Sequence, residues 1–216
     1  DADDVWLPGK LAAQCRALHA APRAGAAYGW VDIVDARGAV VFADQRARYE
    51  GDVYVQLLRA NFVYSGSNVL VRREVFDEAG GFDVTLRAVE DWELNVRLAR
   101  IADFACVPRV LVHYRQRPDS LSGQLDVMEQ AFLAARTRVF ADAPPALRHL
   151  EAHASASFYV YLAMRATQQG WRPRSWRAGL RYAALVMWYR PAAYLDVVRG
   201  AAPLAPLRLS LRELAS

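Results

Sequence analysis

The sequence DADDVWLPGKL, residues 1–11, places three carboxylates within four positions, at Asp1, Asp3 and Asp4. Side chains of like charge repel one another at this spacing unless a cation lies between them. Mg²⁺ and Mn²⁺ prefer oxygen ligands and keep coordination positions open for phosphate oxygens. The stretch therefore predicts either a divalent-metal site or a solvated acidic turn ahead of a helix that begins near Pro8.

The composition is that of a folded chain with an uneven distribution of charge. Hydrophobic residues make up 54 % of the 216 residues, which is enough to bury a core. The net charge of +4 divides into −4 for residues 1–108 and +8 for residues 109–216, where every basic residue is Arg. The basic half favours phosphate or an anionic membrane surface as a partner, and no nucleic-acid-reading motif accompanies it. The longest apolar run, residues 182–189, is too short to span a membrane.

The two cysteines, Cys15 and Cys106, show no Cys-x-x-Cys spacing. Both have apolar neighbours in the sequence, which predicts buried thiols and a reducing compartment. A helix from about residue 8 to residue 20 is expected to bury Cys15 in a stripe with Leu11 and Leu18. The sequence shows no signal peptide, so we expect a cytoplasmic location, at the inner face of the cell membrane if the basic half contacts lipid.

Alternating polarity predicts strands in the first half of the chain. Residues 26–35 predict one strand, and residues 39–43 predict its hairpin partner. Residues 104–107 and 110–114 predict two short strands broken at Pro108. Hairpins are unusual in an all-parallel sheet, so the pattern indicates a mixed sheet.

The sequence VEDWELNVRLAR, residues 89–100, predicts a helix whose apolar stripe includes Leu94 and Leu98. One turn earlier Asp91 falls on the same stripe and is expected to point inward. The helix N-terminus favours acids, which explains Glu90 but not an inward Asp91, because a buried charge is costly unless it is paired. A functional role is therefore one explanation for an inward Asp91.

Two loops carry further candidate binding residues. Gly66, followed by Ser67 and Asn68, either lets a ligand approach the backbone closely or forms an ordinary tight turn. Arg115 and Arg117 belong to the segment RQRPDSLSG. That segment predicts either a mobile lid that grips a diphosphate or a solvated basic loop.

Four blocks of this sequence resemble, in order and spacing, the family 2 glycosyltransferases of the GT-A fold. The blocks are residues 1–14, 66–83, 89–100 and 107–122. The resemblance implies an α/β fold, in which residues 1–122 form the C-terminal part of a GT-A domain with a mixed sheet and flanking helices. An all-α C-terminal region, residues 123–216, is expected to follow. The resemblance also implies that a nucleotide-binding half of roughly 60–100 residues precedes Asp1.

The resemblance further implies inverting transfer of a sugar from a nucleotide-diphosphate sugar to a hydroxyl of a glycan or lipid-linked acceptor. Asp91 would act as the general base. Mg²⁺ or Mn²⁺, held by Asp1, Asp3 and Asp4, would neutralise the diphosphate. The residues expected to bind substrate are Gly66, Ser67, Asn68, Glu90, Trp92, Arg115 and Arg117.

Two other functional classes stay open. A chain without a nucleotide-binding half is a non-catalytic remnant that acts, if at all, as a helical interaction module. A Mg²⁺-dependent phosphohydrolase also uses an Asp-x-Asp motif, although that class usually places the motif after a buried strand. In calorimetry with a nucleotide sugar and Mn²⁺, a remnant should show no heat of binding. Phosphate release from a generic ester would support the phosphohydrolase.

The C-terminal part of the chain predicts three helices and a short fourth that ends near Val198. The third combines arginines with tryptophans: Arg174, Arg177, Arg181, Trp176 and Trp188. Such a helix either makes peripheral contact with a membrane or packs its tryptophans inward and its arginines outward. Packing is the favoured interpretation of the two.

Overall fold

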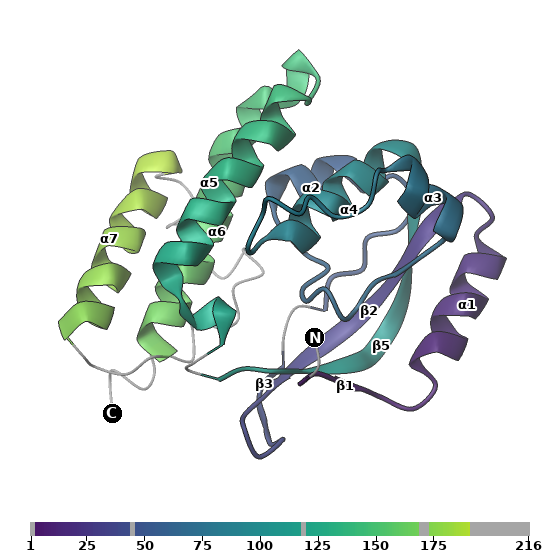
Figure 1. Ribbon diagram of the computed structural model, residues 1–216, viewed down its shortest axis with the longest axis horizontal. Helices are drawn as coiled ribbons and strands as arrows, with labels where there is room; N and C mark the ends of the chain where they lie inside the picture. Colours follow the sequence, from purple (N-terminus) through teal and green to yellow (C-terminus); the bar gives the residue numbers. More distant parts are fainter. Residues whose placement is uncertain (1–2, 44–45, 118–119, 169–172, 191–216) are drawn as a thin grey trace.

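The computed structural model describes residues 3–43, 46–117, 120–168 and 173–190. A mixed sheet of five strands carries helices on both faces, and a group of longer helices follows it (Figure 1). The predicted fold class, a mixed α/β sheet followed by a helical region, is confirmed. Asp1 and the predicted fourth C-terminal helix lie outside the described residues.

The sheet is built around one long parallel pair of strands, with antiparallel strands added at its edges. Its path runs β1 (Val5–Trp6), β5 (Asp103–Arg115), β2 (Ala24–Val34) and β3 (Val40–Ala43), and β4 (Leu70–Val71) also pairs with β2. Only the β2–β5 pair is parallel. The predicted hairpin is the β2–β3 pair, where the Asp35 carboxylate accepts hydrogen bonds from the backbone N–H groups of the turn.

Strand β5 is continuous, so the prediction of two strands broken at Pro108 is wrong. Gly29 pairs with Val107 and the next residue, Trp30, pairs with Val110. Pro108 and Arg109 therefore form a bulge, which accommodates a residue that cannot donate to the ladder. Gly29 is needed opposite this bulge, because a Cβ there would lie 2.4 Å from Leu111 Cδ1.

Helix α1 (Lys10–Ala20) packs on β2 and β5 with a different face from the one predicted. Leu11 is 45 % exposed and Cys15 is exposed, so their expected burial is wrong, whereas Cys106 is buried as predicted. The buried residues of the helix are Lys10, Ala13, Gln14 and Leu18.

Hydrogen bonds explain why polar side chains of α1 face the sheet. Gln14 Nε2 donates to the carbonyl oxygens of Ala27 at 2.9 Å and Asn68 at 2.6 Å. Lys10 Nζ in turn donates to Gln14 Oε1 at 2.8 Å. The Gln14 amide thus has partners for both its nitrogen and its oxygen, which lowers the cost of turning it toward the sheet.

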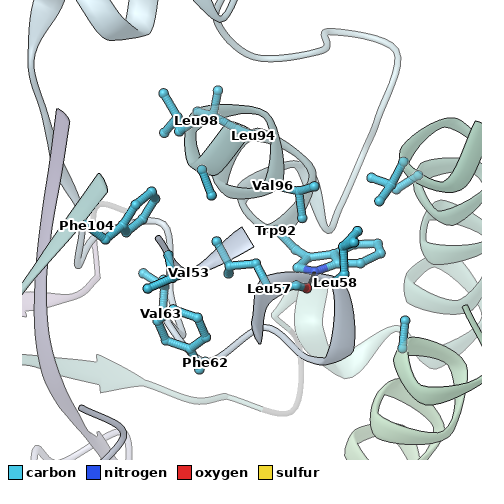
Figure 2. Packing of buried hydrophobic residues seen from close by; sticks show 14 of the residues in the cluster. Val53, Leu57, Leu58, Phe62, Val63, Trp92, Leu94, Val96, Leu98 and Phe104 are labelled. Carbon is cyan, nitrogen blue, oxygen red and sulfur yellow. Dashed lines mark hydrogen bonds between the residues drawn. The ribbon is translucent and has the colours of Figure 1, made fainter. Parts of the chain in front are cut away.

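The other face of the sheet is covered by three helices: α2 (Tyr54–Arg59), α3 (Arg73–Glu78) and α4 (Glu90–Ile101). Leu57 and Leu58 of α2 pack beside Leu94 and Leu98 of α4 in the main hydrophobic cluster (Figure 2). Trp92 joins the two helices because its Nε1 donates to the Leu57 carbonyl oxygen at 2.8 Å. This packing fixes the N-terminus of α4, where Asp91 lies.

The helical region contains α5 (Leu125–Ala141), α6 (Glu151–Gln168) and α7 (Pro173–Tyr189). A 3₁₀ helix, Pro145–Leu150, leads into α6, which begins later than its apolar pattern suggested. The main hydrophobic cluster also includes Phe132 of α5, whose ring stacks on Phe158 of α6 at 4.0 Å between centroids. One core thus crosses the predicted boundary at residue 122, while the division into two domains stays a prediction.

The tryptophans of α7 do not pack inward, so the favoured interpretation of this helix is wrong. Trp176 is 48 % exposed and Trp188 is 82 % exposed. The helix contacts α6 through Tyr182 and Val186, which are both buried. Within the described part of the chain, no helix has the length and apolarity needed to cross a membrane.

Candidate active site

A cavity of about 620 Å³ lies between the sheet-and-loop half of the molecule and the helices α5 and α6. Asp3 and Asp91, which are far apart in the sequence, both line it. Five of the seven predicted substrate-binding residues also line it: Gly66, Glu90, Trp92, Arg115 and Arg117. The cavity thus gathers residues from all four sequence blocks.

Asp91 occupies the first turn of α4 and faces this cavity. Its Oδ1 accepts a hydrogen bond from the Trp92 backbone N–H at 2.7 Å. Burial, and to a lesser degree the nearby charge of Glu90, raise the pKa of Asp91 to about 6, although hydrogen bonds from the Trp92 N–H and the Asn61 side chain oppose the shift. A carboxylate with this pKa is ionised at pH 7 and is a better proton acceptor than a solvated Asp.

Asp4 serves as a tether between three segments. Its Oδ1 accepts from the Arg115 backbone N–H and its Oδ2 accepts from Ser65 Oγ, each at 3.1 Å. Tyr64 and Ser65 have φ values of 48° and 71°, a strained conformation for residues other than glycine. Asp4 is outside the cavity lining and its two hydrogen bonds give it a structural role, while its predicted assignment as a metal ligand stays a prediction.

Asp3 is the acid of the first block that reaches the cavity in the described residues. Its carboxylate lies 3.5 Å from Arg117 Nη2, and its side chain is 32 % exposed. Among the residues that the structure describes, no cluster of three or more His, Cys, Asp or Glu side chains forms a metal site. Asp1 lies outside the described residues, so the predicted three-acid metal site stays a prediction, and Asp3 is the described acid of the motif that lines the cavity.

Arg115 fastens the N-terminal segment to the turn between β2 and β3. Its guanidinium donates to the carbonyl oxygens of Asp3, Asp35 and Ala36 at 3.0–3.1 Å. These bonds position the cavity wall, while its predicted contact with phosphate stays a prediction. Arg117 is the more exposed of the two arginines of the segment, at 47 % of its side chain.

The loop from Gly66 to Asn68 divides into one residue at the cavity and two in the core. Gly66 faces Asp91, since a Cβ built on it would lie 3.8 Å from Asp91 Cβ. Asn68 is fully buried, its Nδ2 donating to the carbonyl oxygens of Gly29 and Val63 and its Oδ1 accepting from the Gly29 N–H. The Asn68 amide therefore holds the loop, and the predicted contact of Asn68 with substrate stays a prediction. Ser67 is also buried and outside the cavity lining.

Trp92 belongs mainly to the core. It is only 2 % exposed, and its ring lies 5.4 Å from that of Phe132. Trp92 also lines the cavity, and its predicted contact with substrate stays a prediction. Glu90, beside it on α4, lines the cavity and contributes negative charge near Asp91.

The sequence did not predict that α6 forms part of the cavity wall. Tyr161 and Arg165 line the cavity opposite the strand end that carries Tyr114. Burial raises the pKa of both tyrosines, which keeps them protonated at neutral pH. The available signal was Arg165 itself, a charged residue in the apolar stripe of a predicted helix.

The model of the glycosyltransferase-like family 2 matches residues 1–166 of this chain. The chain belongs to this family. No curated protein matches it. The matched region of this family 2 glycosyltransferase includes the sheet, Asp3, Asp91 and the whole described cavity wall up to Arg165. Membership supports sugar transfer in general, with a nucleotide-sugar donor and an acceptor.

Proposed function

We propose that this family 2 glycosyltransferase transfers a sugar, with inversion at the anomeric carbon, from a nucleotide-diphosphate sugar to a hydroxyl of a glycan or lipid-linked acceptor. The observation that carries the proposal is Asp91, a half-buried carboxylate with a pKa of about 6 that faces a cavity also lined by Asp3 and Arg117. One cavity thus offers a base for the acceptor and charged groups for the donor.

In the proposed reaction the acceptor oxygen attacks the anomeric carbon while the bond from that carbon to the diphosphate oxygen breaks. Asp91 takes the proton of the attacking hydroxyl, and the electron pair of the broken bond stays on the diphosphate. Arg117 lies at the cavity, where its charge would stabilise the departing anion. Attack opposite the leaving group gives the inverted product.

We further propose Mg²⁺ or Mn²⁺ as a cofactor, with Asp3 as its ligand from the described residues. Donor phosphate oxygens and water are the ligands that such ions accept alongside a single carboxylate. When bound, the ion would neutralise charge on the diphosphate. The Asp3–Arg117 distance of 3.5 Å is that of a loose ion pair, which a competing cation can displace.

Proton NMR of the product tests the proposal. The protein, as its gene encodes it, is incubated with Mn²⁺, a panel of nucleotide-diphosphate sugars and a panel of glycan acceptors. The proposal predicts release of nucleoside diphosphate together with a product whose anomeric configuration is opposite to that of the donor. A retained configuration contradicts the mechanism. Release of inorganic phosphate from a simple ester supports a phosphohydrolase instead, and no binding of any donor supports a non-catalytic module.

We also propose that α7 contacts an anionic membrane surface, which would place the enzyme at the cytoplasmic face of a membrane with a lipid-linked acceptor. Besides the two tryptophans, Leu180 and Met187 are 59 % and 45 % exposed, and Arg177 lies on the same helix. Large apolar side chains flanked by arginines are typical of helices that lie in a lipid interface.

Sedimentation with lipid vesicles tests this contact. Vesicles that contain phosphatidylglycerol should bind the protein, and vesicles of phosphatidylcholine alone should bind it weakly. Trp188→Ala combined with Leu180→Ser should reduce binding. Val84→Ser is the matched control, because Val84 is 94 % exposed on a distant loop. Equal binding by the double variant and the control would contradict the contact.

A further inference from the structure

Arg165 is a cation buried in the wall of the cavity. It is 5 % exposed, although Arg is rarely buried without a paired charge. Its Nε donates to the Ser122 carbonyl oxygen at 3.2 Å, and its Nη1 donates to Gln116 Oε1 at 2.8 Å and Gln168 Oε1 at 2.7 Å. Nη2 makes a long contact of 3.4 Å with Ser122 Oγ. All these acceptors are electrically neutral.

In the described part of the chain, no carboxylate lies within 4.0 Å of the Arg165 guanidinium. Other arginines of the helical region do have acidic partners: Arg136 pairs with Glu151, and Arg181 pairs with Glu129. A buried charge that has only neutral partners is costly, and an anion at this position would relieve that cost.

The position of Arg165 relative to Asp91 indicates which substrate would supply this anion. Tyr161 and Tyr114 lie within the electrostatic range of both residues, since Asp91 raises and Arg165 lowers the pKa of each tyrosine. The expected diphosphate position is beside Asp3, on the N-terminal segment. Arg165 belongs to α6 and bonds Gln116, which lies between Arg115 and Arg117 in the chain. Its α6 neighbours Tyr161 and Met164 line the cavity with it.

We propose that Arg165 binds a carboxylate or phosphate group on the acceptor, and so orients a hydroxyl of the same molecule toward Asp91. This inference rests on the proposed sugar transfer and narrows its acceptor to an anionic one. Gln116 and Gln168 hold the guanidinium in place through its Nη1 atom, and the less engaged Nη2 is the group left for the ligand.

Isothermal titration calorimetry with three small probes tests the site without requiring turnover. Glucuronate carries the carboxylate, glucose 6-phosphate carries the phosphate, and glucose is the neutral comparison. The wild-type protein should bind at least one anionic probe about 10-fold or more tightly than glucose, because a hydrogen bond between charged groups is worth that much. The anionic probe that binds more tightly identifies the charged group, carboxylate or phosphate, that the acceptor carries.

Three variants complete the test. Arg165→Gln should abolish the preference for the anion, and Arg165→Lys should retain part of it, because Lys keeps the charge but not the planar fork. Arg16→Gln, a change to an exposed arginine of α1 outside the cavity lining, should leave the preference unchanged. A thermal melt of each variant shows whether it is folded. If Arg165→Gln is unfolded, the comparison is made with Arg165→Lys.

Two results would overturn the inference: a wild-type protein without any preference for the anions, or a folded Arg165 variant without charge that keeps the preference. If the preference depends on Arg165 but no donor sugar is ever transferred, the anion site stands and the proposed reaction fails.

Discussion

Replacement of Asp91 by Asn should stabilise the fold at neutral pH while it removes the proposed base. The Asn side chain retains an Oδ1 acceptor for the Trp92 N–H and fills the same volume, so the main change is the loss of the negative charge. Because burial is the largest cause of the raised pKa of Asp91, the ionised carboxylate is poorly accommodated in the folded protein.

The size of the effect follows from the pKa shift. An Asp whose pKa is higher in the folded than in the unfolded state binds more protons when folded, so stability falls as pH rises from about 4 to about 6. The change from 3.8 to about 6 corresponds to about 3 kcal/mol at pH 8, and to less than about 1 kcal/mol at pH 4. The amide of the Asp91→Asn variant cannot ionise, so the variant avoids this loss.

Urea denaturation at pH 8 and pH 4 measures the difference in the free energy of unfolding between wild type and Asp91→Asn. We expect the variant to be more stable by about 2–3 kcal/mol at pH 8 and by much less at pH 4. Asp77→Asn is the matched control, because Asp77 is an exposed acid on α3. An Asp91→Asn variant that is less stable than wild type at pH 8, or a gain that does not vary with pH, would refute the reasoning.

Three further predictions concern the first-block acids Asp3 and Asp4, the buried Asn68, and Gly29 opposite the bulge. Asp3→Ala should raise the Mn²⁺ concentration needed for half-maximal transfer, and equal Mn²⁺ curves for this variant and wild type would exclude Asp3 as a ligand. Asp4→Ala should instead lower the melting temperature, because two hydrogen bonds are lost, and leave the Mn²⁺ requirement unchanged. Asn68→Ala should lower the free energy of unfolding by about 3 kcal/mol in urea denaturation, because three buried backbone groups lose their partner. A decrease below about 1 kcal/mol would contradict the structural role of Asn68. Gly29→Ala should lower the free energy of unfolding by about 1–3 kcal/mol in the same assay, because its Cβ would overlap Leu111. An unchanged urea midpoint would show that β5 shifts at the bulge to make room for the Cβ.

Local patterns predicted the elements whose stability depends on nearby residues. The β2–β3 hairpin and the inward position of Asp91 follow from alternation and helical periodicity, and both are present in the structure. The face of α1 could not be predicted in this way, because Gln14 finds its partner Asn68 54 positions further along the chain. Apolarity alone would turn Leu11 inward, but hydrogen bonding decides otherwise.

The sequence predicted the acidic residues of the candidate site but not the cavity wall that α6 forms. Asp3 and Asp91 lie in compact motifs that are visible in the sequence, although the division of work between Asp3 and the tether Asp4 depends on the loop that carries Ser65. Arg165 is positioned only when α6 packs beside a second 3₁₀ helix, Leu121–Gly123, which contains Ser122. No sequence spacing encodes that contact.

The central claim is that Asp91 acts as the base for sugar transfer. Donor binding by calorimetry and single-turnover transfer, both measured on Asp91→Asn and wild type at pH 8, test it most directly. The account predicts a donor dissociation constant within about 2-fold of wild type and a transfer rate lower by at least about 100-fold. A variant that binds donor normally and transfers sugar within about 10-fold of the wild-type rate would contradict it.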